Sequence, residues 1–333
     1  MTITLSVLDQ SASAAGRGDA AAIRDTLELA AHCESLGYHR FWVSEHHALP
    51  TIVGSAPEVL MGAIAARTTR IRIGSAGVML PHYSALKVAE QFRVLDALAP
   101  GRIDLGVGRA PGGDMRTAQA LNPNAYAAAD NFPEQVRDLH AWTTQPQHRG
   151  IAAHPLGSTS PALWILGSSN YGAQLAAHFG LPYAFAYFFT DGAGAAQALD
   201  LYRELFKPSA VLAAPQATVC VWALVADSDA DALHHALSRD RWRVDRQRGV
   251  FGPLQPPDSI AQGGFAPAEM PTLDAMRAKS FVGSAAAVAA KLRALAAELQ
   301  LDELVVNTWA FDPDVRRRSY ALLARQFGLA AAA

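Results

Sequence analysis

The chain has 333 residues, half of which are hydrophobic, and a formal net charge of −2 at pH 7. This length is usual for one α/β barrel, and the apolar content provides ample material for a large core. A charge so close to neutrality argues against nucleic acid or an anionic membrane as a partner. Cys33 and Cys220 offer no disulfide framework, the first residues lack a basic signal region, and the most apolar window (181–189) is too short to cross a bilayer. We therefore expect a cytoplasmic protein.

Short runs of β-like composition alternate with longer helical patterns along the chain. The predicted strands are residues 3–8, 40–44, 71–74, 103–107, 163–166, 183–187, 218–225 and 304–306. The predicted helices are residues 20–36, 57–68, 84–98, 133–142, 171–179 and 195–206, followed by one that begins at Asp312-Pro313. Ser55 and Glu58 have the spacing of a capping box at the start of the second helix. Eight strands alternating with helices predict a (β/α)₈ TIM barrel, with a doubly wound sheet as the alternative.

Residues 240–280 interrupt this alternation before the eighth strand. The segment is rich in Gly, Pro and Gln, which predicts a long loop. A loop of that length inside a compact domain is usually a functional lid or a disordered insertion. We therefore expect one domain over residues 1–333, with an insertion or lid at about 240–280.

The tripeptide Glu45-His46-His47 follows the second predicted strand, at the end of the barrel where active sites lie. Because side chains alternate along a strand, Glu45 and His47 should leave one side and His46 the other. The group could bind a metal, transfer a proton, contact a cofactor or simply decorate the strand end. His82 follows the third strand, but the set lacks the usual spacing of metal ligands, so we predict no metal site.

A glycine-rich segment, residues 106–113, follows the fourth predicted strand. Its third glycine comes one position too late for a dinucleotide fingerprint, and Pro111 stands where a helix should begin. What remains is Arg109, a permanent cation whose planar fork of donors suits a phosphate. The alternative is an ordinary ion pair with Asp104 or Asp114.

Small residues also follow the fifth and the third predicted strands. Ser168 and Ser169 precede a helix, where free N–H groups and hydroxyls suit an anion, although ordinary helix capping is the alternative. With Arg109 on the adjacent strand, they suggest one phosphate between the two strand ends. Residues 74–81 would let a flat ligand lie close to the backbone, or they could form a bulge or a tight packing contact.

Several collinear segments resemble the bacterial luciferase-like flavin monooxygenase family. They are WVSEHH, SAPEVL, RIRIGSAGVMLPHYSALKVAEQFRVLDALAPGRIDLGVGRAPGG, GSSNYGAQLAAHFGLP and the terminal DELVVN. The resemblance covers nearly the whole chain and is strongest over residues 38–114. Within the family, the chain looks most similar to luciferase-like proteins of uncharacterised substrate. The family fold is a TIM barrel, in agreement with the strand and helix pattern.

The resemblance implies that reduced FMN binds at the carboxyl-end mouth of the barrel. Arg109 aligns with a phosphate-binding arginine, and Ser169, with Ser168 beside it, aligns with a phosphate-contacting serine. Ala76 and Gly77 fall where the family often has a non-proline cis peptide beside the isoalloxazine ring. His46 aligns with a catalytic histidine, and its imidazole, which titrates near neutrality in water, would serve in proton transfer.

Other positions bear on the substrate. Glu45, His47 and Asn307 are candidates for contact with the substrate or the lid. Luciferase has a reactive cysteine just before the arginine, whereas this chain has Gly108. That difference argues against light emission and against a long-chain aldehyde as substrate.

The activity implied is the oxygenation of a small organic molecule by O₂ and reduced FMN. Because the chain has no second nucleotide site, a separate NAD(P)H:flavin reductase is expected to supply the reduced FMN. The alternatives are an F420-dependent hydride-transfer oxidoreductase and a non-catalytic flavin-binding protein. A homodimer is also expected, because related flavin barrels pair through the helices at 57–68 and 86–98. The apolar residues assigned to that interface are Leu60, Met61, Ile64, Val88, Phe92 and Leu95.

Overall fold

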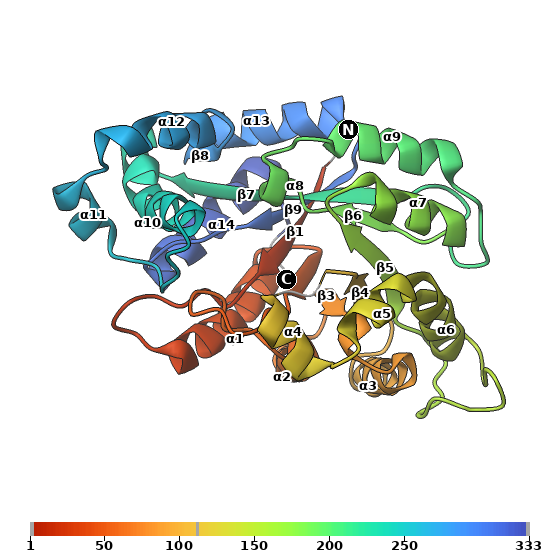
Figure 1. Ribbon diagram of the computed structural model, residues 1–333. Coiled ribbons are helices and arrows are strands. Elements are labelled where there is room, and N and C mark those ends of the chain that lie inside the picture. The colour runs from red at the N-terminus through yellow and green to blue at the C-terminus, as the bar shows by residue number, and fades with distance from the viewer. Residues whose placement is uncertain (1–2, 111–112, 331–333) are drawn as a thin grey trace.

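The computed structural model describes residues 3–110 and 113–330, so Pro111, which interrupts the glycine-rich segment, lies outside the described residues. Eight parallel strands close into a barrel in the ring order β1, β2, β3, β4, β5, β6, β7, β9 and back to β1 (Figure 1). Their bounds are β1 Thr4–Asp9, β2 Arg40–Val43, β3 Arg72–Met79, β4 Ile103–Gly108, β5 Ala162–Gly167, β6 Tyr183–Phe185, β7 Ala217–Ala226 and β9 Glu303–Asn307. The predicted TIM barrel is confirmed, with all eight predicted strands in the ring.

A further short strand, β8 (Phe281–Ser284), pairs with the carboxyl end of β7 outside the ring. No strand is predicted there, because four residues are too few for a clear periodic pattern. The strand extends β7 beyond the barrel, so the chain between β7 and β9 is held above the mouth.

Helices surround the strands (Figure 1). Their bounds are α1 Asp19–Ser35, α2 Pro57–Ala65, α3 Ala85–Leu98, α4 Met115–Leu121, α5 Ala125–Asp130, α6 Phe132–Thr144, α7 Asn170–Phe179, α8 Tyr187–Thr190, α9 Ala195–Leu205, α10 Asp229–Gln247, α11 Pro257–Gly263, α12 Met270–Ala278, α13 Ala285–Glu298 and α14 Pro313–Phe327, with 3₁₀ turns η1 Leu80–His82 and η2 Pro267–Glu269. In the described part of the chain, none of them is long and apolar enough to span a membrane.

Two predicted helix caps have different outcomes. Asp312 caps α14 as predicted, and its carboxylate accepts a hydrogen bond of 2.8 Å from the backbone N–H of Asp314. The Ser55–Glu58 capping box is wrong, because α2 begins at Pro57 and its N-cap is Ala56. Proline is preorganised for the first helical position, so it sets the start of the helix one residue later than the serine would.

The prediction of a long loop over residues 240–280 is also wrong. Helix α10 continues to Gln247, and α11, η2 and α12 occupy most of the remainder. The Gly and Pro residues mark helix ends: Pro257 begins α11, Gly264 ends it with a positive φ of 66°, and Pro267 begins η2. Arg241 joins α10 to Glu269 at 2.7 Å, so this segment packs as ordered helices.

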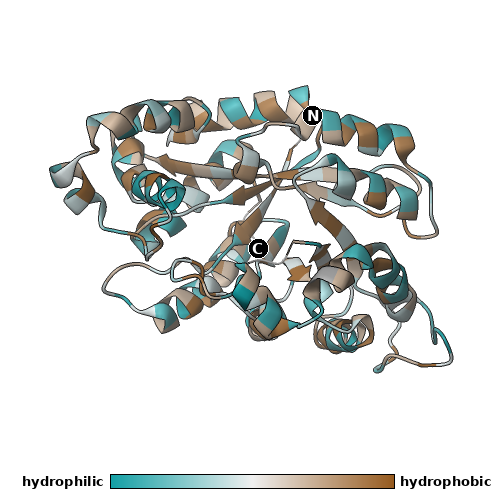
Figure 2. Cartoon of the chain, in the orientation of Figure 1, coloured by the Kyte–Doolittle hydropathy of each residue, from teal (hydrophilic) through white to brown (hydrophobic). Residues whose placement is uncertain are grey.

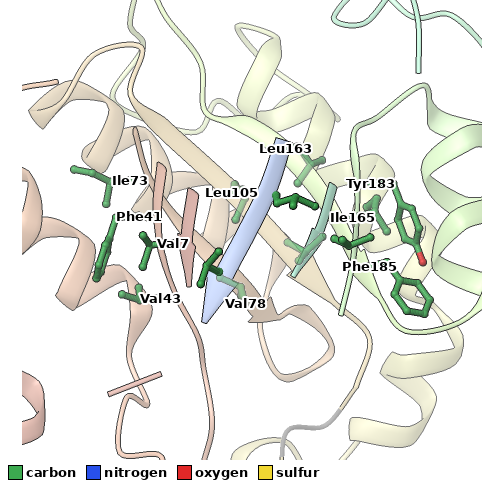
Figure 3. Close-up of a cluster of buried hydrophobic side chains, with 14 of the residues drawn as sticks. Val7, Phe41, Val43, Ile73, Val78, Leu105, Leu163, Ile165, Tyr183 and Phe185 are labelled. Atoms are coloured by element: carbon green, nitrogen blue, oxygen red, sulfur yellow. The ribbon is translucent and has the colours of Figure 1, made fainter. Parts of the chain in front are cut away.

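The main core lies between the barrel and its helices. The strands are largely apolar (Figure 2), and ten of the strand residues in the main core are labelled in Figure 3. They are Val7, Phe41, Val43, Ile73, Val78, Leu105, Leu163, Ile165, Tyr183 and Phe185. The six residues assigned to a dimer interface belong to this same core and are buried within the monomer. The assignment of these six residues to a dimer interface is therefore wrong, because the apolar faces of α2 and α3 that carry them pack against the barrel.

Polar and aromatic layers fill the interior of the barrel. Near the amino ends of the strands, Arg40 lies 2.8 Å from both Asp104 and Glu303, and Arg72 pairs with Asp104 at 2.6 Å. Above them the Trp42 and Trp164 rings meet edge to face at a centroid distance of 5.2 Å, and the Trp42 indole donates to Asp104 at 2.9 Å. These layers fill the interior of the barrel below its carboxyl-end mouth.

Candidate active site

Glu45 fixes the loop after β2 to the end of β3. Its buried carboxylate accepts hydrogen bonds from the backbone N–H of Met79 at 3.0 Å and the Tyr83 hydroxyl at 2.6 Å. It also lies 2.8 Å from the His47 Nε2 atom. Burial and the hydrogen bond to Glu45 raise the pKa of Tyr83, so the phenol stays protonated. Glu45 thus sets the position of His47, and the two side chains lie together as strand alternation predicts.

His46 is held by its backbone and points away from this pair. Its N–H donates to the Gly54 carbonyl at 3.0 Å, and its Nδ1 atom lies 3.2 Å from the Ser44 hydroxyl oxygen. Burial lowers the pKa of His46 to about 4, against the opposing effect of the Glu45 charge. The expectation that this imidazole titrates near neutrality is therefore wrong, because desolvation outweighs the nearby carboxylate. At neutral pH it is an uncharged hydrogen-bonding group.

The predicted cofactor residues converge on one cavity of about 330 Å³ at the mouth of the barrel, which we call the inner cavity. Trp42 and Leu8 lie at its base, where the tryptophan layer ends. The predicted site residues in its wall are Glu45, His46, Ala76, Gly77, Arg109, Ser168 and Ser169. Residues that are distant in the chain are therefore brought together as their positions at strand ends predict.

The Ala76–Gly77 peptide is cis, as the resemblance implies. It lies at a register shift in the pairing of β3 with β4. A Cβ atom at Gly77 would lie 2.4 Å from the Leu166 Cδ1 atom and 2.7 Å from the Gly106 carbonyl oxygen. Glycine is therefore required there by close packing against β4 and β5, and Ala76 is left to line the cavity.

The cation of Arg109 is available to a ligand. Its guanidinium carbon lies 4.1 Å from the centre of the Tyr171 ring, and within residues 3–110 and 113–330 it forms no ion pair. Asp104 is engaged by Arg40 and Arg72, while the Asp114 carboxylate caps α4 through the Thr117 N–H at 2.8 Å. The alternative of an ion pair with either aspartate is therefore wrong.

Ser169 is the N-cap residue of α7, yet its hydroxyl makes no capping hydrogen bond. The N-terminus of this ten-residue helix therefore lies beside Ser168 and Ser169, which line the cavity, and its first N–H groups donate no hydrogen bond to the N-cap side chain. Arg109 lines the same cavity. A cation without an ion pair among the described residues, two hydroxyls and a helix N-terminus together suit a phosphate.

A second, larger space of about 860 Å³ adjoins the first, and we call it the outer chamber. Gln10, His46, Phe188 and Phe189 line both, so the two spaces meet at these side chains. His47 and Asn307, which are predicted to contact the substrate or the lid, line the outer chamber. The Asn307 amide donates to Gln10 at 2.6 Å.

Sequence reasoning missed several of the lining residues. Tyr171 beneath Arg109 could have been found, since it lies two positions after Ser169 at the start of a helix. Helix α10, which supplies one wall of the outer chamber, could not, because its sequence is remote from every motif.

Comparison with known proteins identifies the family. The model for luciferase-like monooxygenases matches residues 2–303. A luciferase-like monooxygenase of Escherichia coli (strain K12) is 42% identical over 325 residues, which cover 96% of this chain and 96% of that protein. The structure of apo-MsnO8 superposes with a TM-score of 0.91 at 34% identity, covering 99% of this chain and 100% of that chain.

Two less similar structures share the fold alone. One is the oxygenating constituent of 3,6-diketocamphane monooxygenase from Pseudomonas putida in complex with FMN, with a TM-score of 0.73 at 19% identity, covering 98% of this chain and 97% of that chain. The other is an F420-dependent secondary alcohol dehydrogenase, with a TM-score of 0.67 at 15% identity, covering 97% of this chain and 98% of that chain. The family model matches residues 2–303, and the similarity to the Escherichia coli protein extends over nearly the full length of both chains. The chain therefore belongs to the luciferase-like monooxygenase family.

Proposed function

We propose that the protein is an FMN-dependent monooxygenase that uses O₂ to oxygenate a small organic substrate. The observation that carries this proposal is the convergence of Arg109, the Ser168-Ser169 turn, the Ala76–Gly77 peptide and His46 on one cavity. The cavity volume falls within the range of about 300–1,000 Å³ that is usual for small-ligand sites. The Arg109 cation, which forms no ion pair within the described residues, and the Ser169 hydroxyl, which makes no capping hydrogen bond, fit a phosphate group.

Each part of the cavity has a distinct task in this proposal. Arg109 and the N-terminus of α7 would bind the phosphate, with the cation remaining stacked on Tyr171. Trp42 and Leu8 would support the apolar ring system from below, and Ala76 would let it lie close to the β3 backbone. When bound in its reduced form, FMN supplies the electrons that activate O₂.

His46 is placed where the inner cavity meets the outer chamber. Because its imidazole is neutral at physiological pH, it can donate a hydrogen bond from one ring nitrogen or accept one at the other. Phe188 and Phe189 line the same junction and would exclude water from the reacting atoms. The protein's contribution is thus to orient the two reactants and to hold a proton donor or acceptor between them.

Electrons would come from a separate NAD(P)H:flavin reductase, because the glycine-rich segment at the end of β4 lacks the spacing of a dinucleotide fingerprint. A Cβ atom at Gly106 would lie 2.2 Å from the Ser75 carbonyl oxygen, so that glycine is needed by the sheet. Reduced FMN arriving by diffusion would require the reductase in the same compartment, which we take to be the cytoplasm. Both cysteines are free and buried, as suits a reducing environment.

The test is to supply reduced FMN or reduced F420 to the purified protein anaerobically and to measure binding of each. We expect reduced FMN to bind and its reoxidation spectrum in air to differ from that of free FMN. Binding of F420 in preference to FMN would favour the hydride-transfer alternative. With NADH and FMN present, we expect rapid NADH oxidation only after a reductase is added. Rapid oxidation by the protein alone would show that it reduces its own flavin.

We also propose a homodimer that forms through the exposed faces of α2 and α3. Val59, Val94 and Leu98 are 65%, 48% and 64% exposed, although the opposite faces of both helices are buried. They line a shallow groove between the two helices, whose lining also includes the polar residues Glu58, Lys87, Glu90 and Gln91. A second copy of the chain would cover these three apolar side chains around a twofold axis, with the charged residues beside them at the edge of the contact.

A further inference from the structure

Helix α10 presents a row of arginines to the outer chamber. Arg239, Arg243 and Arg246 are spaced so that one face of the helix carries all three, and all three line the chamber together with His46. The only acidic residue in the same wall, within the described part of the chain, is Asp114. Its carboxylate already accepts the Thr117 N–H. The chamber therefore carries an excess of positive charge.

Arg239 is the most unusual of the three because it is buried and lacks an anion. Its residue is 7% exposed, and its guanidinium carbon lies 3.7 Å from the centre of the Trp222 ring. It forms no hydrogen bond or ion pair with any residue in ranges 3–110 and 113–330. Burial and the charge of Arg243 lower its pKa, against the opposing charges of Asp240 and Asp191.

The neighbouring carboxylates are engaged elsewhere. Asp191 pairs with Arg243 at 2.6 Å, and Asp240 pairs with Arg277 at 2.7 Å. Asp191 and Asp240 therefore act on Arg239 only through their charge, and neither carboxylate forms an ion pair with it. A buried charge without a partner is costly unless a ligand satisfies it.

Two further donors in the same wall have no acceptor. The indole N–H groups of Trp222 and Trp309 are buried and form no hydrogen bond within the described residues. Both rings line the outer chamber. Buried donors normally have partners. The same wall holds one unpaired acceptor, the Asn307 Oδ1 atom, so the three unpaired donor groups outnumber it and indicate a ligand rich in acceptor oxygens.

We propose that the outer chamber binds an organic acid, whose anionic head group is held by Arg239 and whose apolar body extends toward His46. Arg246 contributes a second positive charge, and the aromatic side chains of Trp242 and Phe251 provide apolar wall. A carboxylate or a sulfonate would supply the acceptor oxygens equally. We further infer that this acid is the substrate, and this step rests on the proposed monooxygenase function. The binding of the acid in the chamber does not depend on that function.

The test is isothermal titration calorimetry on the flavin-free protein with 4-phenylbutyrate, the corresponding sulfonate and the neutral 4-phenylbutyramide. We expect one or both acids to bind at least about tenfold more tightly than the amide, and the stronger acid identifies the head group. Equal binding of amide and acids would overturn the proposal. Repeating the titration with saturating FMN should leave the affinity for the acid unchanged. Competition between acid and FMN would instead assign these arginines to the cofactor phosphate.

Variants localise the binding. Arg239→Met should weaken acid binding about tenfold to a hundredfold and leave amide binding unchanged, while the melting temperature stays level or rises. Arg248→Gln removes the same charge from an exposed position that pairs with Glu269 at 2.9 Å, and it should bind as the wild type does. If Arg239→Met fails to fold, Arg246→Gln on the exposed end of the row should still weaken acid binding. Wild-type affinity in both Arg239→Met and Arg246→Gln would refute the assignment.

Discussion

His46 and Arg109 line the same cavity, but their surroundings control their charges in different ways. Burial lowers the pKa of His46 to about 4, so the imidazole is neutral at physiological pH. Arg109 is exposed, stays charged and stacks on Tyr171 without an anionic partner. One residue thus offers a permanent charge for binding and the other an uncharged hydrogen-bonding group for the chemistry.

Arg109→Ala should weaken FMN binding by tenfold or more. Removing a charge-assisted hydrogen bond usually costs about 1.5–3 kcal/mol. Quenching of FMN fluorescence on binding measures the affinity. Arg116→Ala is a matched control, because Arg116 is exposed on α4 and lines neither cavity. Unchanged affinity in Arg109→Ala would place the phosphate elsewhere.

His46→Ala should retain FMN binding and lose most substrate oxygenation, with hydrogen peroxide formed instead. The side chain lies at the junction of the two spaces, so its loss removes a hydrogen-bonding group and admits water there. The measurement is the ratio of product to peroxide at equal oxygen consumption. A ratio equal to that of the wild type would exclude a role for His46 in the reaction.

The depressed pKa of His46 also predicts a pH dependence of stability. An unfolded histidine binds a proton at about pH 6.5, whereas the folded one does so only near pH 4, so the unfolded state binds more protons between these values. This residue therefore reduces the stability as the pH falls through that window and has no effect above it. His46→Gln should lose less stability than the wild type on acidification, measured by thermal melts. Parallel pH profiles would show that His46 is protonated normally.

Sequence reasoning predicted that these residues lie together, as they do in the inner cavity, but not their charge states. Arg109, Ser169 and His46 follow strand ends, and a barrel brings strand ends together whatever the rest of the chain does. The pKa of His46 and the free cation of Arg109 depend on which groups surround them after folding. Asp104 pairs with arginines of β2 and β3 and so is not available to Arg109. No local sequence pattern predicts these contacts.

At the scale of elements, the buried ionic layer joins strands that are distant in sequence. Asp104 of β4 holds Arg40 of β2 and Arg72 of β3, and Arg40 also reaches Glu303 of β9. Asp104 is fully buried. The layer therefore determines which strands can be neighbours near the closed end of the barrel.

Asp104→Ala should destabilise the fold by about 3–5 kcal/mol, because it leaves a buried arginine charge uncompensated. Urea unfolding of the variant and the wild type measures the difference. Asp227→Ala provides a comparison, since the exposed Asp227 pairs with the exposed Arg318 at 2.7 Å and its loss should cost much less stability. Equal small losses in both variants would mean that water already reaches the interior layer.

The success of sequence reasoning differed between strands and helices. Strands such as β7, with its run of buried apolar residues, have a composition that identifies them directly. The helices between β7 and β9 were harder, because Pro257, Gly264 and Pro267 mark helix ends but also suggest a loop. Only packing of α10 against Glu269 and Arg277 shows that the segment is ordered.

At the scale of the whole molecule, barrel closure was predictable and the outer chamber was not. Alternation of strands and helices is enough to predict a closed ring. The chamber forms because α10 returns over the mouth, where Trp242 donates a hydrogen bond of 2.7 Å to the Thr51 hydroxyl. The backbone of Leu254 also pairs with Ser13 and Ala15 in the loop after β1. Contacts across more than 190 positions of sequence give no local pattern to read.

The faces of α2 and α3 that stay exposed after folding are the proposed dimer interface. Leu98 and Val94 project from α3 beside Val59 of α2, while the buried stripes of both helices pack on the barrel. Leu98→Glu would place a charge in an apolar interface and should convert a dimer to a monomer without loss of fold. Light scattering gives the mass, and circular dichroism checks the fold. Leu205→Glu alters an exposed leucine on α9 and should remain dimeric. A wild-type protein that is monomeric at micromolar concentration would refute this interface, and a Leu98→Glu variant that stays dimeric would move it to another face.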